Sequence, residues 1–229
     1  MNVFAEQVRQ AWNWLTASAH WQGDDGIPHR LAQHLGYCVL ALVIAAVIAL
    51  ALGLIVGHTG RGGFIIVSIA NLARAIPTLG LLLLVVTVTS IGLTPVIVPL
   101  IALAIPPILV NTYEGIRGVD GDLKDAAQGM GMTGWRVLTR VETPVALPLI
   151  VLGLRTAAIQ VVATATIAAV AGLGGLGRYI VDGLSRKDYA SVVGGSVLVV
   201  ALAIAVQIGF TGLRRVIVSP GIRGASRTS

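Results

Sequence analysis

Residues 125–144 read DAAQGMGMTGWRVLTRVETP and form the longest polar interval between two strongly apolar runs of the chain. The segment 123–128, at the start of this interval, is rich in helix-favouring residues, and Asp122 is placed to cap it. Gly129 and Gly131 then interrupt the helical pattern. We therefore expect a first short helix that ends at these glycines.

A second short helix is expected after the glycines. Thr133 can cap its first turn, and Trp135, Leu138 and Val141 recur at helical spacing. The dipeptide Thr143-Pro144 is expected to end this helix, because the residue before a proline disfavours the helical conformation. Two short helices around a glycine turn, presented between apolar runs, predict a docking surface rather than a flexible linker.

The composition is that of a membrane protein. Hydrophobic residues make up 55% of the chain, charged residues only 11%, and the mean hydropathy is +0.88. Soluble domains contain about 25% charged residues, so a soluble class is excluded. The net charge of +6 is interpreted as loop arginines at an anionic membrane face, and no basic run interleaved with aromatic residues supports nucleic-acid binding. The single Cys38 excludes a disulfide framework.

The apolar runs predict an all-α polytopic membrane protein with about five transmembrane helices. A helix needs ~20 apolar residues to cross the hydrocarbon layer, and several runs meet this length. The expected spans are 35–56, 75–93, 94–112, 156–172 and 189–213. They belong to a transmembrane domain at 35–213 with a polar loop at 120–148, preceded by a segment at 1–34 and followed by a basic tail at 214–229.

The N-terminal segment 1–34 has two interpretations. Either residues 3–15 form an amphipathic helix that lies in the membrane interface with tryptophans as anchors, or the segment is a loosely ordered tail. Its histidines, His20, His29 and His34, are not spaced like metal ligands, so we expect no metal site there.

Two regions of the transmembrane domain leave their placement open. The segment 64–73 is moderately apolar and runs either along or into the interface, and Arg74 at its end is interpreted as an interfacial anchor. Arg155, near the inner end of the fourth span, is likewise interpreted as an arginine that extends its charge to the membrane surface.

Three polar residues of the fourth span are candidates for a translocation path. Gln160, Thr164 and Thr166 lie among small residues, and they either line the path or hydrogen-bond to a neighbouring helix.

The sequence contains no motif of a catalytic or nucleotide-binding site. Residues 172–177 read GLGGLG and formally match GxGxxG, but they follow a spanning helix rather than a strand, so we interpret them as an extracytoplasmic turn. GxxxxGK[ST], HExxH and GxSxG are all absent. We therefore predict that the chain is not an enzyme and carries no cofactor or metal.

The arginines predict the orientation. Placing Arg61, Arg74, the polar loop and the arginine-rich C-terminal end in the cytoplasm satisfies the positive-inside rule, although Arg178, Arg186 and Lys187 then lie outside. With five spans the N-terminus lies outside and the C-terminus in the cytoplasm.

The polar loop resembles the cytoplasmic signature of the permease subunits of ABC importers. That signature is Glu-Ala-Ala, three residues, Gly, nine residues and Ile-x-Leu-Pro. Asp125-Ala126-Ala127, Gly131, Val141, Thr143 and Pro144 stand at the matching places, with Asp, Val and Thr as departures. Residues 111–120, NTYEGIRGVD, and the later GMGMT resemble the quaternary-amine osmoprotectant branch of the family.

The resemblance implies a type I ABC importer permease in a bacterial plasma membrane. In that family the loop is a cytoplasmic coupling helix that sits in a cleft of an ATPase subunit, which holds ATP and Mg²⁺. The implied partners are ABC ATPase subunits, an extracytoplasmic substrate-binding protein, a second permease copy or related permease, and lipids. The residues to which we assign ATPase coupling are Asp125, Ala126, Ala127, Gly129, Gly131, Thr133, Val141 and Pro144.

The resemblance also implies a substrate class. We expect a small osmoprotectant such as glycine betaine, carnitine, choline or proline, with methionine or another amino acid as the alternative. An ion-coupled secondary transporter is a further alternative. It is less consistent with the sequence, because no Asp or Glu falls within an expected span.

Overall fold

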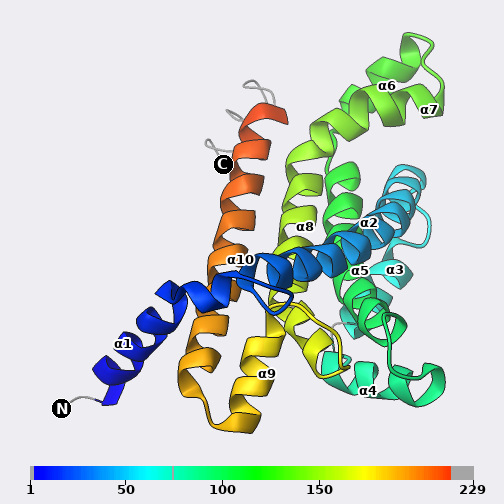
Figure 1. Cartoon of the computed structure of the whole chain (residues 1–229). Helices are drawn as coiled ribbons and strands as arrows, with labels where there is room; N and C mark the ends of the chain where they lie inside the picture. Colours follow the sequence, from blue (N-terminus) through cyan, green and yellow to red (C-terminus); the bar gives the residue numbers. More distant parts are fainter. Residues whose placement is uncertain (1–2, 74, 218–229) are drawn as a thin grey trace. The chain divides into compact units, whose positions relative to one another are not determined.

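The fold is described from a computed structural model that covers residues 3–73 and 75–217, with side chains from residue 6 onward. Across these residues the chain forms helices and no strands (Figure 1). The elements are α1 (Val3–Thr16), η1 (Ser18–Trp21), α2 (Ile27–Thr59), α3 (Gly63–Ala73), α4 (Thr78–Thr89), α5 (Thr94–Arg117), α6 (Gly121–Gly129), α7 (Gly134–Val137), η2 (Leu138–Glu142), α8 (Thr143–Thr164), η3 (Ala165–Ala169), α9 (Gly177–Arg186) and α10 (Tyr189–Ile217). Arg74, Arg223 and Arg227 lie outside the described residues.

The helices confirm the all-α membrane fold. In the described part of the chain, four helical stretches are long and apolar enough to cross a membrane: Ile27–Thr59, Thr94–Arg117, Gly134–Ala169 and Tyr189–Ile217. The pair α3 and α4 passes the same test together, so the number rises to five if this pair is one broken span. The expected number of about five is therefore consistent with the structure.

The first long helix begins well before the apolar run that predicted it. Helix α2 starts at Ile27, whereas the apolar run starts at residue 35. Pro28 fits the first turn of a helix, where its missing N–H has no intrahelical partner. The polar residues of the early turns are used in contacts, since Gln33 accepts a hydrogen bond from the backbone N–H of Gly175 at 2.9 Å.

The chain divides into two compact units. The first contains residues up to Leu42 together with Pro77–Ile101 and Ile159–Ala205, and the second contains Val43–Ile76, Ala102–Ala158 and residues from Val206 onward. The helices α2, α5, α8 and α10 contribute residues to both units. The polar loop at 120–148, which carries the predicted docking surface and is called the docking loop below, belongs to the second unit.

In the second unit, α2 packs closely against α5 through two glycines. Gly53 and Gly57 of α2 form a GxxxG pattern, which lets two membrane helices approach closely. A Cβ added at Gly53 would lie 2.8 Å from Thr112 Cβ, and one at Gly57 would lie 2.7 Å from Ile116 Cβ. The backbones are therefore too close at this contact for any side chain larger than hydrogen.

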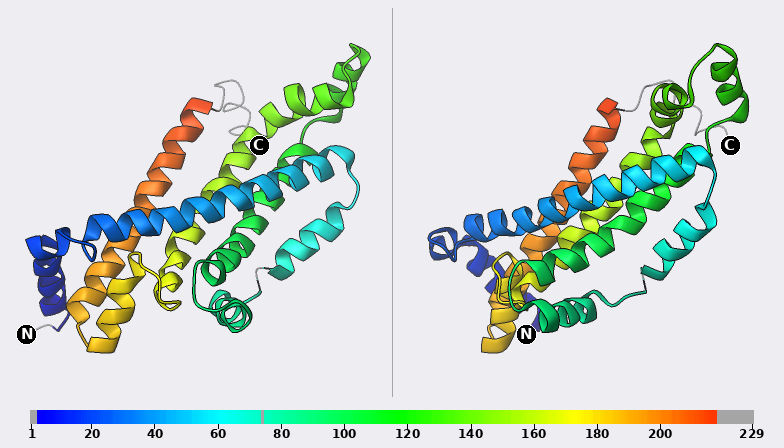
Figure 2. Two further views of the ribbon diagram at one scale, coloured as in Figure 1. Left: turned by 45° about the vertical axis from the view of Figure 1, so that its right-hand side comes forward. Right: turned by 90° about the vertical axis from the view of Figure 1, so that its right-hand side faces the viewer.

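In the same unit α5 also packs against α8. A Cβ added at Gly153 of α8 would lie 2.7 Å from the carbonyl oxygen of Pro107. Nearer the loop, Ile116 joins a buried apolar cluster with Leu138, Ala146 and Ile150. This cluster therefore lies where the docking loop joins α5 and α8. Figure 2 shows α6 and α7 at the N-terminal end of α8.

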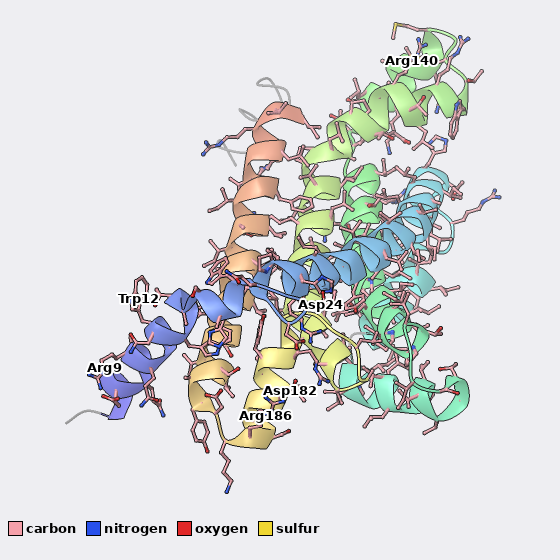
Figure 3. The ribbon with its side chains drawn as sticks, in the orientation of Figure 1. Arg9, Trp12, Asp24, Arg140, Asp182 and Arg186 are labelled. Atoms are coloured by element: carbon pink, nitrogen blue, oxygen red, sulfur yellow. The ribbon has the colours of Figure 1, made fainter. Side chains whose placement is uncertain are left out.

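In the first unit, α1 is attached by a buried tryptophan. Trp14 stacks on His20 with ring centroids 4.4 Å apart and meets Tyr179 of α9 edge-on at 4.9 Å. Gly194 of α10 faces the indole, because a Cβ there would stand 2.3 Å from Trp14 Cε3. On the outer side of α1, Trp12 is 66% exposed and is labelled in Figure 3.

The glycine-rich segment 172–177 follows η3, ends at the first residue of α9, and packs against the start of α2 in the first unit. Gly175 has a φ of +94°, which favours glycine, and its neighbours include the His34 imidazole. His34 is fully buried, and its Nε2 contacts the carbonyl oxygen of Val162 at 2.9 Å. This carbonyl lies just before the α-helical pattern of α8 changes to a 3-10 helix at Ala165.

Candidate functional site

The first helix of the docking loop is α6, and its cap differs from the expected one. The Asp120 carboxylate accepts a hydrogen bond from the backbone N–H of Asp122 at 3.0 Å, so Asp120 is the N-cap. The prediction that Asp122 caps the helix is wrong. Asp120 has an extended ψ of 134°, and the helix therefore starts at Gly121, with Asp122 already in its first turn.

The glycine turn ends α6 with a specific set of backbone hydrogen bonds. Met132 N donates to Ala127 O at 3.1 Å, and Gly131 N donates to Gln128 O at 2.8 Å. This pair of bonds is a Schellman motif, which needs a left-handed residue after the helix. Gly131 supplies it, with a φ of +80°. The predicted interruption at the glycines therefore corresponds to a hydrogen-bonded C-terminal cap of α6.

The second helix does not stop where it was expected to stop. The structure continues from α7 through a π-helical turn at Leu138–Glu142 directly into α8, which begins at Thr143. The Thr143 backbone N–H and side-chain hydroxyl both donate to Leu138 O, the latter at 2.8 Å. Pro144 cannot donate a backbone hydrogen bond, and its ring would clash with the carbonyl group four residues earlier in a regular α-helix. The wider π turn just before it makes room for the ring, so the helix continues through the proline.

The residues assigned to ATPase coupling lie at different depths in this loop. Asp125, Ala126, Gly129, Gly131 and Thr133 are exposed. Val141 and Pro144 are half-buried, whereas Ala127 is only 3% exposed. The small residues Ala126, Gly129 and Gly131 thus form part of the outer surface, while Ala127 packs inward, on a helix that contacts α7 and η2.

Large apolar side chains on the outside of the same loop are exposed. Leu123 is 45% exposed, Met130 73% and Trp135 72%. Arg136 and Arg140 are also exposed, and Arg140, labelled in Figure 3, lies in the π turn η2 that precedes α8. A loop that presents a tryptophan and a methionine to its surroundings, beside small residues, is typical of a protein interaction site.

Beneath this surface lies a buried carboxylate that the sequence analysis missed. Glu142 is 1% exposed. Its Oε1 accepts from Lys124 Nζ at 3.2 Å, and its Oε2 contacts His58 Nδ1 at 2.6 Å. Lys124 Nζ also donates to the backbone oxygen of Ile116 at 3.2 Å. A buried carboxylate is costly unless it is paired, and here each oxygen has its own partner.

The network joins parts of the chain that are far apart in sequence. His58 lies in the last turn of α2 and Ile116 in the last turn of α5, whereas Lys124 is on α6 and Glu142 ends the π turn. A signal for Glu142 was present in the sequence. Leu138, Glu142, Ala146 and Ile150 recur every four residues, so a carboxylate occupies an otherwise apolar stripe.

The candidate path residues have different environments. Gln160 is exposed, and Thr164 and Thr166 are half-buried in the first unit. The Thr166 hydroxyl donates to Ala163 O at 3.1 Å within its own helical stretch. Arg155, in the second unit, donates from Nε to Gln207 Oε1 of α10 at 2.6 Å, so it is held by a neighbouring helix rather than extended freely to the membrane surface.

Residues 33–224 match the family described as binding-protein-dependent transport system inner membrane component. The glycine betaine/carnitine/choline transport system permease protein OpuCB of Bacillus subtilis is 33% identical over 88% of this chain and 93% of its own length. The osmoprotectant import permease protein OsmW of Salmonella typhimurium is 32% identical over 83% of this chain and 91% of its own length.

A solved structure shares the fold. A chain from the MetNI methionine ABC transporter in an inward-facing conformation matches with a TM-score of 0.69 at 26% identity. The match covers 82% of this chain and 94% of that one.

Proposed function

The chain belongs to the family of inner membrane components of binding-protein-dependent transport systems, and from this premise we propose that it is the permease subunit of an ATP-driven importer for a small osmoprotectant. It is a multi-pass protein of the bacterial plasma membrane. The proposed substrates are glycine betaine, carnitine or choline. They are supported by the names of relatives that match along most of their own length.

The observation that carries the coupling role is the construction of the α6–α7 loop. It presents small residues and the exposed Met130 and Trp135 on its outside. On its inner side, the ion pair between Lys124 and the buried Glu142 joins α6 to the π turn before α8. A loop that docks into a cleft of a partner ATPase must expose a contact surface and be held firmly to the helices behind it. A loosely attached loop would move by itself and would not transmit the movement of the ATPase to those helices.

The proposed mechanism is alternating access. The ATPase partner supplies the hydrolysis of ATP with its Mg²⁺, and its movement is passed to the α6–α7 loop of this chain. The long helices that follow the loop then shift and change the side to which the path is open. Gln160, Thr164 and Thr166 are proposed as residues that line this path, and a second copy or a related permease encloses the other half.

The proposed orientation places the loop in the cytoplasm and α1 outside. It is supported by the exposed arginines Arg136 and Arg140 of the loop and by Arg214 and Arg215 near the end of α10, as the positive-inside rule expects. On the other side, α1 is proposed to lie in the membrane interface with the exposed Trp12 as an anchor. An extracytoplasmic binding protein is proposed to supply substrate selectivity.

The assembly is tested by purifying the tagged chain from its native membrane in mild detergent and identifying the proteins that co-purify. Recovery of an ABC ATPase, lost when Trp135 is changed to Glu, is the expected result. Trp12→Glu, on the exposed side of α1, is the matched control and retains the ATPase. Recovery of the chain without an ATPase would contradict the proposal.

The substrate is tested by uptake of radiolabelled glycine betaine, carnitine, choline, proline and methionine into cells that lack their own osmoprotectant importers. We expect uptake of at least one quaternary amine and no uptake of methionine. Methionine uptake alone would contradict the osmoprotectant assignment while leaving the permease role intact. Uptake driven by an ion gradient without ATP would identify a secondary transporter instead.

A further inference from the structure

The buried carboxylate of Glu142 ties the docking loop to two long helices. We propose that Glu142 is a positioning residue that clamps α6 to the ends of α2 and α5, so that these parts move as one piece during transport. This inference rests on the proposed coupling function of the loop.

The clamp has one contact for each carboxylate oxygen. Lys124 Nζ lies 3.2 Å from Oε1, and His58 Nδ1 lies 2.6 Å from Oε2. The Glu142 side chain is only 2% exposed, and those of Lys124 and His58 are 20% and 27% exposed. A neutral imidazole with its proton on Nδ1 already donates to the carboxylate, so this contact does not depend on a charged His58.

Lys124 extends the clamp to a third helix. Its ammonium also donates to Ile116 O, at 3.2 Å, in the last turn of α5. Backbone oxygens at the C-terminal end of a helix carry a partial negative charge and favour a cation. One lysine therefore joins the loop both to the carboxylate of Glu142 and to the end of α5.

The position of Lys124 makes the clamp suitable for passing movement inward. It directly precedes Asp125 and Ala126, which are exposed on the proposed docking face. Below it, the π turn that ends at Glu142 runs without interruption into α8. A displacement of α6 thus reaches α8 through Glu142, and α2 through His58.

An ionic clamp differs mechanically from an apolar contact at this place. Apolar surfaces tolerate sliding, because their attraction has no direction. Charged hydrogen bonds in a buried site are directional, and breaking one leaves an unpaired buried charge. The clamp therefore holds one geometry between the loop and the helix ends, which is what a coupling element needs.

The first experiment measures the geometry in the purified full chain. In a Cys38→Ala background, spin labels are placed at Thr59→Cys and Thr139→Cys, both exposed positions of the second unit. Pulsed electron paramagnetic resonance in nanodiscs gives the distribution of distances between them. We expect a narrow distribution with Glu142 and a broad one in Glu142→Gln.

The matched control is Glu114→Gln, an exposed carboxylate on α5 that makes no ion pair in the described part of the chain. It leaves the distribution narrow. Lys124→Gln broadens it as Glu142→Gln does, and the double variant is no broader than either single one, because the two residues act as a unit. An unchanged distribution in Glu142→Gln would overturn the proposal.

The second experiment measures coupling in the reconstituted complex with its ATPase. In Glu142→Gln we expect the amount of substrate imported per ATP to fall about tenfold, as loss of one charged hydrogen bond predicts. ATPase binding and the apparent affinity for substrate stay unchanged. A variant that imports with normal coupling would overturn the clamp, whereas a wild-type chain that binds no ATPase would overturn the proposed function and leave the distance result standing.

Discussion

At the scale of single residues, Gly129 and Gly131 of the docking loop have different roles although they lie only two positions apart in the sequence. Gly131 has a φ of +80°, and no atom lies within 4 Å of a Cβ added there. Glycine is therefore needed at position 131 for its backbone conformation and not for lack of space. Gly129 ends α6 without a positive φ, and its surroundings are also open.

We predict opposite effects for Gly131→Ala and Gly129→Ala on stability. The left-handed conformation costs a residue with a Cβ about 1–2 kcal/mol, so Gly131→Ala destabilises the loop end of the second unit. Gly129→Ala stabilises α6 by about 0.5 kcal/mol, because alanine loses less entropy in a helix. Hydrogen exchange of α6 in nanodiscs checks both changes. Equal protection in the two variants would contradict the assignment of the Schellman turn to Gly131.

The two tryptophans of α1 also differ. Trp14 is 8% exposed and packs on His20, Tyr179 and the Gly194 backbone, whereas Trp12 is 66% exposed. We predict that Trp14→Ala destabilises the first unit by about 3 kcal/mol, through loss of a buried aromatic side chain. Trp12→Ala leaves thermal stability in detergent unchanged.

Membrane binding distinguishes the outer tryptophan. If α1 lies in the interface, Trp12→Ala reduces the quenching of α1 fluorescence by brominated lipids, since an interfacial anchor is lost. The quenching is measured with a fluorophore attached at Arg9→Cys in a Cys38→Ala background, and Trp14 is kept because it packs α1 against its neighbours. Equal quenching with and without Trp12 would count against the interfacial position of α1.

At the scale of elements, α5 is the helix on which the second unit is built. It meets α2 at Gly53 and Gly57, and it meets α8 at Gly153. Its own prolines do not end it, since α5 runs from Thr94 to Arg117 without interruption. Membrane helices attract one another through close packing rather than through exclusion of water, so glycine contacts decide which helices are neighbours.

We predict that Gly57→Val separates α2 from α5. A Cβ there would lie 2.7 Å from Ile116 Cβ, and both atoms are fixed to backbones, so a helix must move. The expected cost is about 1–3 kcal/mol, as for overpacking in other cores. Gly36→Val on the same helix is the control, because nothing lies within 4 Å of its Cβ. Thermal unfolding in detergent measures both, and equal melting temperatures would contradict the packing.

At the scale of the whole molecule, the orientation in the membrane determines which surfaces meet which partners. We predict that Ser185→Cys, on α9, reacts with a membrane-impermeant maleimide in intact cells, whereas Thr139→Cys reacts only after the membrane is permeabilised. Both positions are exposed, and the background is Cys38→Ala. The reverse pattern would place the docking loop outside and contradict its contact with a cytoplasmic ATPase.

The sequence by itself determined the class of the protein and the place of the docking loop. Long apolar runs need no tertiary information to predict membrane helices, since the bilayer imposes their length. The glycine turn was also predictable, because Gly131 follows a helix-forming segment and satisfies a local backbone requirement. These features depend only on neighbours along the chain.

Only the tertiary structure decided the rest. The helix continues past Pro144 because a π turn precedes it, and local propensity does not indicate such a turn. The partners of Glu142 are the clearest case, because His58 lies 84 positions away in the sequence. A buried charge selects its partners through space and not through spacing along the chain, so the sequence showed a carboxylate in an apolar stripe, and the fold alone placed Lys124 and His58 around it.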